Sequence, residues 1–152
     1  MIRLALPQDA ANIAEMSRAY IEQGLGWSWT RARVLGAIRD ASTNVVVAQE
    51  QGMVLGFGIM QYGDESAHLS LLAVKPRHRH KGLGTQLVAW LEQPALAAGI
   101  GRIRVEARAD NPRAIAFYQR QGFRDLATIS GYYQGAIDAV RLEKKLGSGH
   151  RE

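Results

Sequence analysis

Three apolar, strand-like segments follow one another in the middle of the chain, and this succession constrains the fold most. Residues 45–48 form a β-branched run, Gln51-Gly52 signals a turn, and residues 54–62 are predicted to return as the second strand of a hairpin. A third strand is predicted over residues 68–74. Strands joined by short turns pair as neighbours, so this part of the chain is expected to form a meander.

Beyond residue 82, helix-like and strand-like segments alternate. Apolar residues at helical spacing predict a helix that begins near Gly82, and Pro94 is expected to kink or break it because proline removes a backbone donor. A second helix is predicted from Pro112, after Asn111, to Gly122. Strands are predicted around it, over residues 103–107, 123–129 and 139–146. This order indicates a mixed α/β fold around one sheet.

The first forty residues are predicted to add one strand and two helices. Residues 2–6 alternate in polarity until Pro7 ends the strand, Asp9 is expected to cap the first helix, and Thr30 is expected to cap the second. The length of 152 residues predicts one domain over residues 1–146, with residues 147–152 as a flexible tail.

Composition limits both the chemistry and the location. The chain has no cysteine, which excludes disulfides, thiolate zinc sites, iron–sulfur clusters and a cysteine acyl-enzyme. A net charge of +5 favours an anionic partner. No apolar stretch approaches the roughly 18 residues of a membrane span. The segment before Pro7 is too short for a signal peptide, so we expect a cytoplasmic protein with no membrane partner.

A basic loop between a strand and a helix is the first candidate binding site. It runs from Val74 through Lys-Pro-Arg-His-Arg-His-Lys to Gly82-Leu-Gly84-Thr85. The first amides of a helix are unpaired, the helix dipole adds positive charge there, and glycines let a diphosphate approach closely. The alternatives are a solvated loop with helix-capping glycines, a metal site at His78 and His80, and a nucleic-acid surface. No cluster of metal ligands and no interleaved aromatic residues support the last two.

A second segment, residues 111–123, has the sequence Asn-Pro-Arg-Ala-Ile-Ala-Phe-Tyr-Gln-Arg-Gln-Gly-Phe. Together with Arg79-x-x-Gly82-x-Gly84 it resembles the acyl-CoA motifs of the GNAT superfamily of N-acetyltransferases. The resemblance implies the acyl-CoA N-acyltransferase fold, an α+β arrangement. In that fold a mixed, mostly antiparallel central sheet of about seven strands is flanked by about four helices.

Further short segments resemble a narrower group, the bacterial N-terminal alanine acetyltransferases of ribosomal proteins and related Nα-acetyltransferases. These segments are Leu72-Ala-Val74, Val105-Glu106-Ala-Arg108, Trp27-Ser28, and Tyr132-Tyr133 with Asp138-Ala139. The chain departs from the group at Gly26, where proline is usual, and at Ala107, where valine is usual. The spacing between Tyr133 and Asp138 is also shorter than in the group.

The resemblance implies acetyl-CoA as the cosubstrate and assigns its contacts. The backbone of residues 72–74 is expected to pair with the pantetheine arm and polarise the thioester carbonyl, and residues 79–85 to hold the diphosphate. The implied contacts are Leu72, Ala73, Val74, Arg79, His80, Lys81, Gly82, Leu83, Gly84, Thr85, Asn111 and Tyr118. Trp27, Tyr132 and Tyr133 are the candidates for binding the amine substrate, and no metal is expected.

Two residues are candidates for catalysis. Tyr118 is the candidate acid, because a phenol with a pKa of about 10 can protonate a thiolate with a pKa of about 8.5. Its alternative role is that of a core aromatic. Glu106 is the candidate general base by resemblance, and its alternative role is an ion pair with Arg104 or Arg108. Without a cysteine or a serine nucleophile motif, direct transfer is expected.

Possible acceptor amines can be compared by the free energy needed to remove their proton at pH 7. This free energy is about 1 kcal/mol for an α-amine and about 4.6 kcal/mol for a lysine. One carboxylate acting as a base can more readily deprotonate the α-amine, so a protein or peptide N-terminus is the first expectation. The alternatives are a small-molecule amine, such as an amino acid, polyamine or antibiotic, and a CoA-binding module without catalysis. A monomer or a homodimer is expected, with no nucleic-acid partner.

Overall fold

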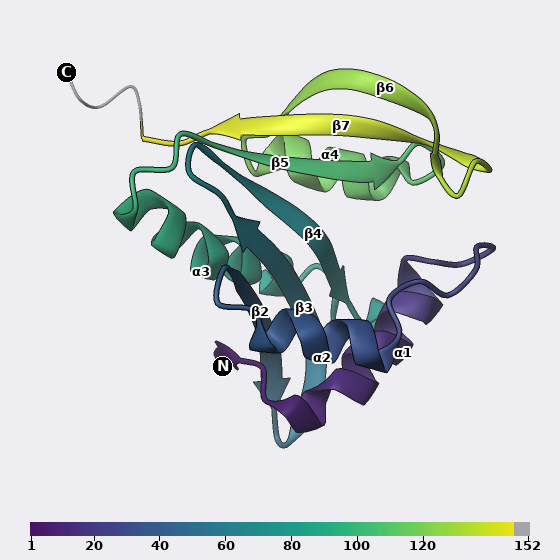
Figure 1. The fold of residues 1–152 in the computed structure, drawn as a ribbon. Helices are drawn as coiled ribbons and strands as arrows, with labels where there is room; N and C mark the ends of the chain where they lie inside the picture. The colour runs from purple at the N-terminus through teal and green to yellow at the C-terminus, as the bar shows by residue number, and fades with distance from the viewer. Residues whose placement is uncertain (148–152) are drawn as a thin grey trace.

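The computed structural model describes residues 1–147, in which one seven-stranded sheet carries helices on both faces (Figure 1). The strands are β1 (Ile2–Leu4), β2 (Thr43–Glu50), β3 (Met53–Tyr62), β4 (Ser66–Val74), β5 (Arg102–Arg108), β6 (Arg124–Tyr133) and β7 (Ile137–Lys145). The α-helices are α1 (Ala10–Tyr20), α2 (Arg31–Arg39), α3 (Leu83–Ala97) and α4 (Pro112–Arg120). Short 3₁₀ turns cover Pro7–Asp9 and Pro76–His78.

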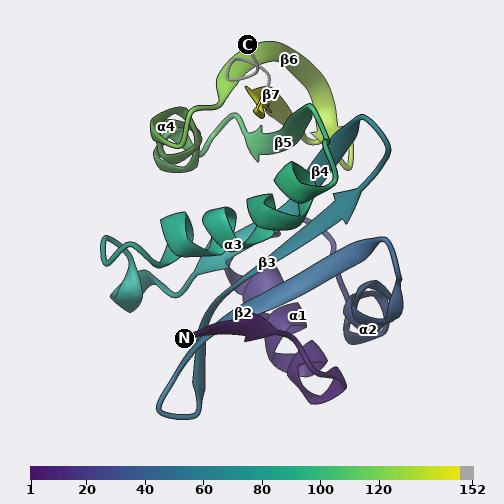
Figure 2. The same cartoon turned by 90° about the vertical axis from the view of Figure 1, so that its left-hand side faces the viewer.

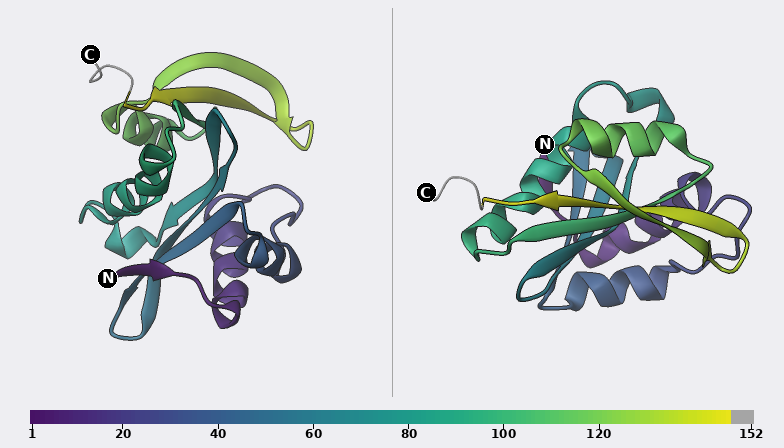
Figure 3. Two further views of the ribbon diagram at one scale, coloured as in Figure 1. Left: turned by 60° about the vertical axis from the view of Figure 1, so that its left-hand side comes forward. Right: turned by 90° about the horizontal axis from the view of Figure 1, so that it is seen from above.

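The strand order is β1-β2-β3-β4-β5-β7-β6, and β4 and β5 are the one parallel pair of neighbours in the described chain. The crossover between them carries α3, as a parallel connection requires. The other neighbours pair antiparallel. The predicted mixed, mostly antiparallel sheet flanked by helices is therefore confirmed. Figure 3 shows β5, β7 and β6 turned away from β1–β4.

Two apolar cores lie on opposite faces of the sheet. Figure 2 shows α3 and α4 on one face and α1 and α2 on the other. Along β2, Val46 and Ala48 pack toward α3, whereas Val45 and Val47 pack toward α1 and α2. The continuous apolar run in the sequence therefore reflects a strand that is covered on both sides.

The helix starts follow local signals. Thr30 Oγ1 accepts a hydrogen bond from the Arg33 amide at 3.4 Å, as predicted for the cap of α2. Asp9 precedes α1, but its carboxylate does not cap that helix. It instead accepts hydrogen bonds from the Leu6 amide at 2.7 Å and from Arg3 at 2.8 Å, both of which lie before the 3₁₀ turn that ends at Asp9.

The predicted break at Pro94 is wrong. Helix α3 continues to Ala97, and the amide of Ala98 donates to the Pro94 carbonyl at 3.0 Å. Pro94 lacks the amide that would donate to the Trp90 carbonyl, but the helix still continues for three residues beyond it. The carbonyl of Leu91 accepts a hydrogen bond from the Tyr62 hydroxyl at 2.7 Å, which ties this turn to β3.

Strand boundaries differ modestly from the predictions. The first strand ends at Leu4 rather than Leu6, and β6 extends to Tyr133. Of the predicted tail, residues 148–152 lie outside the described residues. Within residues 1–147, no helix is both long enough and apolar enough to cross a lipid bilayer.

Candidate active site

The main cavity lies where β4 and β5 separate. The two strands pair only from Ser66 to Leu69 on β4 and from Arg102 to Val105 on β5. Beyond Leu69, β4 remains paired with β3, but within the described chain it has no strand partner on its other edge. Backbone groups on that edge face a cavity of about 300 Å³.

Leu72, Ala73 and Val74 line this cavity, at the place expected for residues that pair with a pantetheine arm. One carbonyl there is already engaged, because Arg79 Nε donates to the Val74 oxygen at 3.1 Å. The remaining edge of β4 offers the regular donors and acceptors of an unpaired strand to an extended ligand.

The predicted diphosphate loop forms one end of the cavity. It passes through Pro76–His78 and a left-handed residue, His80, to Gly82, which precedes α3 with a φ of 83°. No side chain in residues 1–147 caps α3, so its first amides are available to an anion. The loop residues that line the cavity include Arg79, His80, Gly82, Leu83, Gly84 and Thr85, whereas Lys81 does not line it.

Two further features of the loop fit a bound ligand. Nδ1 of His78 is buried, and within the described part of the chain it has no hydrogen-bond partner. Such groups are usually satisfied by water or a ligand, and His78 lines the cavity. A Cβ atom on Gly84 would lie 3.1 Å from the ring of Phe117, so this glycine also permits close packing of α3 on α4.

Helix α4 brings Asn111 and Tyr118 to the same cavity. Asn111 Oδ1 accepts a hydrogen bond from the Ala114 amide at 3.1 Å, so this residue caps α4 while it lines the cavity. Tyr118 is 6% exposed and packs edge-on against Phe117 and Phe123, with ring centroids at 5.3 and 5.6 Å. Burial raises the pKa of its phenol, which therefore keeps its proton at neutral pH.

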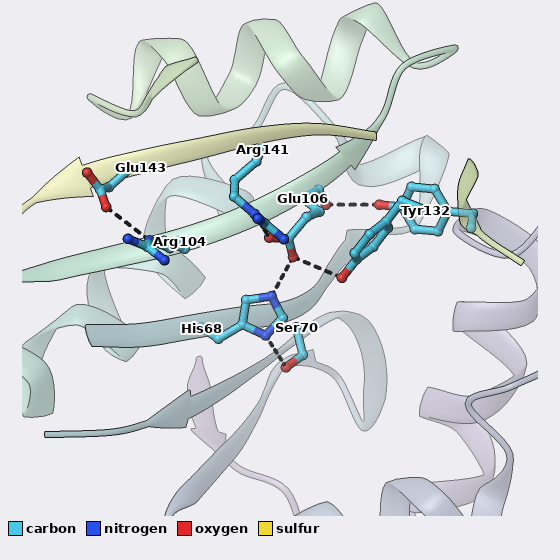
Figure 4. A network of polar contacts seen from close by, with 8 residues as sticks. His68, Ser70, Arg104, Glu106, Tyr132, Arg141 and Glu143 are labelled. Atoms are coloured by element: carbon cyan, nitrogen blue, oxygen red, sulfur yellow. Dashed lines mark hydrogen bonds and ion pairs between the residues drawn. The ribbon is translucent and has the colours of Figure 1, made fainter. Parts of the chain in front are cut away.

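Glu106 lines the cavity and lies at the centre of a polar network (Figure 4). Its Oε1 contacts His68 Nε2 at 2.5 Å and accepts a hydrogen bond from the Tyr132 hydroxyl at 3.2 Å. Its Oε2 accepts from Arg141 Nε at 2.7 Å. The Tyr133 hydroxyl donates to the Glu106 backbone carbonyl at 3.1 Å. Strands β4, β6 and β7 thus each fix this residue of β5.

The charge of Glu106 follows from these partners. Burial by itself would raise the pKa of the carboxyl group, but hydrogen bonds and charges from His68 and Arg141 outweigh it and lower the pKa to about 2. The carboxylate is therefore ionised throughout the physiological pH range. Burial raises the pKa of Tyr133, and the neighbouring Tyr132 and Glu106 raise it further.

The predicted alternative partners of Glu106 are engaged elsewhere. Arg104 Nε donates to Glu143 at 3.0 Å, and Arg108 Nε donates to Asp110 at 3.0 Å. The predicted alternative, an ion pair of Glu106 with Arg104 or Arg108, is therefore wrong. The arginine that pairs with Glu106 is Arg141, which lies directly opposite it in the register of β5 and β7.

Two loops approach each other beside this network. Gly26, in the loop between α1 and α2, donates its amide to Gln134 Oε1 at 2.8 Å. Gln134, in the β6–β7 turn, donates Nε2 to the Gly26 carbonyl at 2.8 Å. A proline at position 26 would have no amide to donate. The departure at Gly26 therefore permits a reciprocal bridge between the two loops.

The aromatic candidates for substrate binding lie around this bridge. Trp27 is 38% exposed and Tyr132 is 41% exposed, while Tyr133 lines the main cavity. The buried carboxylate of Glu22 fixes the loop that carries Trp27. It accepts hydrogen bonds from the Ser28 amide at 2.6 Å and from the Trp29 amide at 3.2 Å.

The sequence alone did not point to His68, Ser70, Arg141 and Gln134. Residues two apart on a strand share a face, so the spacing of His68 and Ser70 was the available signal. The local sequence gives no such signal for Arg141 and Gln134, because both contact residues that are far away in the chain. Within residues 1–147, no group of three or more His, Cys, Asp or Glu side chains is placed to hold a metal ion.

The sequence model described as the acetyltransferase (GNAT) family matches residues 10–123. An uncharacterized N-acetyltransferase of Methanocaldococcus jannaschii is 37% identical over 102 residues, which cover 65% of this chain and 64% of the relative. The ribosomal protein bS18-alanine N-acetyltransferase of Escherichia coli K12 is 32% identical over 94 residues, covering 60% and 64%.

The chain thus spans 64% of the length of these two relatives. Among solved structures, Ard1 from Thermoplasma volcanium superimposes with a TM-score of 0.84 at 26% sequence identity. That match covers 95% of this chain and 96% of the solved chain, so the similarity of fold extends over nearly the whole molecule.

Proposed function

Because the chain belongs to the GNAT family of acetyltransferases, whose acetyl donor is acetyl-CoA, we propose that it acetylates the α-amine of a protein or peptide N-terminus. The observation that carries this proposal is the cavity between β4 and β5. The residues that line it include the uncapped start of α3 together with Glu106 and Tyr118.

The residues of the cavity fit the donor along its length. The amides at the start of α3 and the basic side chains of the loop suit the diphosphate. The free edge of β4 at residues 72–74 suits the pantetheine amides, and backbone donors there can stabilise negative charge that develops on the carbonyl oxygen. Bound acetyl-CoA supplies the acetyl group as a thioester.

Tyr118 serves as the acid in this proposal. Its phenol lines the cavity and is kept protonated by burial, so it can give a proton to the sulfur of the departing CoA. Its neighbours Phe117 and Phe123 hold the ring in place and exclude water. Transfer is direct, from the thioester to the amine.

The acceptor side supports an N-terminal amine. The negative charge of Glu106 attracts an ammonium group toward the cavity, and Tyr132 and Trp27 offer exposed rings to the first residues of a peptide. A relative of 32% identity is named for acetylation of the ribosomal protein bS18 alanine. An α-amine also needs about 3.5 kcal/mol less than a lysine to lose its proton at pH 7.

A peptide panel tests the proposal. The full chain is incubated with acetyl-CoA and short peptides that have free N-termini and no lysine, and release of CoA thiol and the mass of each peptide are measured. Matched peptides with a blocked N-terminus and one lysine, a polyamine and an aminoglycoside are included. We expect the free N-termini to be acetylated with the highest kcat/KM.

Acetylation of the polyamine or the aminoglycoside alone would refute the peptide assignment and support a small-molecule amine acetyltransferase. Stabilisation of the fold by CoA without thiol release from any amine would support a non-catalytic CoA-binding module.

A further inference from the structure

The ionisation of Glu106 raises the question of which group takes the proton from the acceptor amine. Three hydrogen-bond donors hold this carboxylate, His68 and Tyr132 at Oε1 and Arg141 at Oε2. Burial by itself would raise the pKa of this carboxyl group, but the contacts with His68 and Arg141 lower it. Because donors already hold both of its oxygens, this carboxylate is a weak proton acceptor, and another group is needed to take the proton.

The hydrogen bonds of His68 define a proton-accepting atom. An ionised carboxylate only accepts hydrogen bonds, so His68 Nε2 carries the hydrogen of its contact with Glu106 when the imidazole is neutral. The lone pair then lies on Nδ1, and Nδ1 faces the Ser70 hydroxyl at 3.3 Å (Figure 4). Ser70 lines the main cavity and also a second hollow of about 210 Å³ beside α2.

We propose that Ser70 and His68 carry the acceptor's proton out of the cavity, and that Arg141 keeps His68 in the neutral form that can take it. The proposal rests on the acetyl transfer proposed above. Ser70 Oγ takes the proton that leaves the attacking nitrogen while its own proton passes to His68 Nδ1. The imidazolium keeps its Nε2–H on Glu106. The His68 side chain is 41% exposed, so it returns the proton to water. No group is oxidised, and Ser70 ends unchanged.

Arg141 matters because two cations compete for one buried carboxylate. The Glu106 side chain is 6% exposed, and without Arg141 its charge would be balanced by a protonated His68 alone. The imidazole would then keep its proton, and His68 could not accept another one. With Arg141 in place, His68 can be neutral while Glu106 remains paired.

The other charges near His68 are balanced or more distant. Its register partner on β3 is uncharged Gln61, and its register partner on β5 is Arg104, which is paired with Glu143 of β7. The charged and titratable groups on the surrounding elements are Glu106, Arg104, Arg141, Glu143, Tyr132, Tyr133, Arg33 and Asp40. Arg141 is the positive group that touches the carboxylate on which His68 depends.

The first experiment titrates His68 by NMR in the full chain without substrates, with a His68→Gln variant to assign its signal. Arg141→Met removes the arginine that shares the Glu106 carboxylate with His68, so the midpoint of the His68 titration should move to higher pH than in the wild type. Arg141→Lys, which retains the charge, should stay close to the wild-type midpoint. Arg104→Met is the matched control, because it removes the other arginine–glutamate pair between β5 and β7.

The second experiment measures kcat/KM against pH with the best amine from the panel. The acid limb should move to higher pH in Arg141→Met by the same amount as the NMR midpoint. Ser70→Ala should lower kcat at least tenfold and leave the affinity for CoA within twofold. Ser66→Ala, on the same face of β4, should keep wild-type turnover.

Equal midpoints in Arg141→Met and Arg104→Met would overturn the role of Arg141, and wild-type turnover in Ser70→Ala would overturn the relay. The NMR titration needs no acceptor. If the peptide panel failed but the His68 midpoint moved as expected, the α-amine assignment would be refuted. The effect of Arg141 on the protonation of His68 would still be supported.

Discussion

Replacing Glu106 by glutamine tests how strongly the contacts of its carboxylate with His68 and Arg141 stabilise the fold. The pKa of this carboxyl is lowered from 4.5 to about 2 by His68 and Arg141 against the effect of burial. A lowering of this size corresponds to about 3 kcal/mol of stability at neutral pH. The Glu106 side chain is 6% exposed, so solvent screens this contribution little.

The sign follows from the direction of the pKa change. A carboxyl group whose folded-state pKa lies below its unfolded value stabilises the fold above that unfolded value. It loses this contribution as the pH falls toward the folded value. For Glu106 the loss begins below about pH 5 and reaches about 2 kcal/mol by pH 3. Glu106→Gln has no such group, so its stability should fall by about 2 kcal/mol less over this range.

Urea unfolding of both proteins at pH 7 and pH 3 measures the difference. Glu15→Gln, at an exposed position of α1, serves as the control and should retain the pH dependence of the wild type. If the stabilities of wild type and Glu106→Gln changed in parallel between the two pH values, the inferred ion pairing of Glu106 with His68 and Arg141 would be wrong.

Two further changes test the donor side. Tyr118→Phe should lower kcat by about 10²-fold while CoA affinity, measured by calorimetry, stays within twofold; unchanged kcat would remove the acid role. Gly84→Ala should destabilise the fold by about 1–2 kcal/mol and weaken CoA binding, because its Cβ would meet Phe117 at 3.1 Å. Thermal unfolding checks this against Gly36→Ala in α2, where nothing lies within 4 Å of the added atom and about 0.5–1 kcal/mol of stabilisation is expected.

Local signals in the sequence predicted most of the secondary structure. The run at residues 45–48, the Gln51-Gly52 turn and the Pro112 helix start each depend on residues close in the chain, and each has its counterpart in the fold. Pro94 misled the prediction because a helix interior and a helix end look alike until the C-terminal residue is known.

The network around Glu106 could not be predicted in this way. Glu106 meets Arg141 because β7 lies between β5 and β6, and this strand order fixes their register. The chain order of these strands would equally permit β6 to lie beside β5. The motif resemblance located the carboxylate, but the identity of its partners required the sheet.

The bridge between Gly26 and Gln134 has a consequence for how the molecule responds to pH and salt. Both of its hydrogen bonds join uncharged amides, whereas Arg141 holds Glu106 through an ion pair. Neutral amide pairs are indifferent to ionic strength and to proton uptake. The spacing of the two loops should therefore stay constant under changes of pH and salt that weaken the ion pair of Glu106 with Arg141.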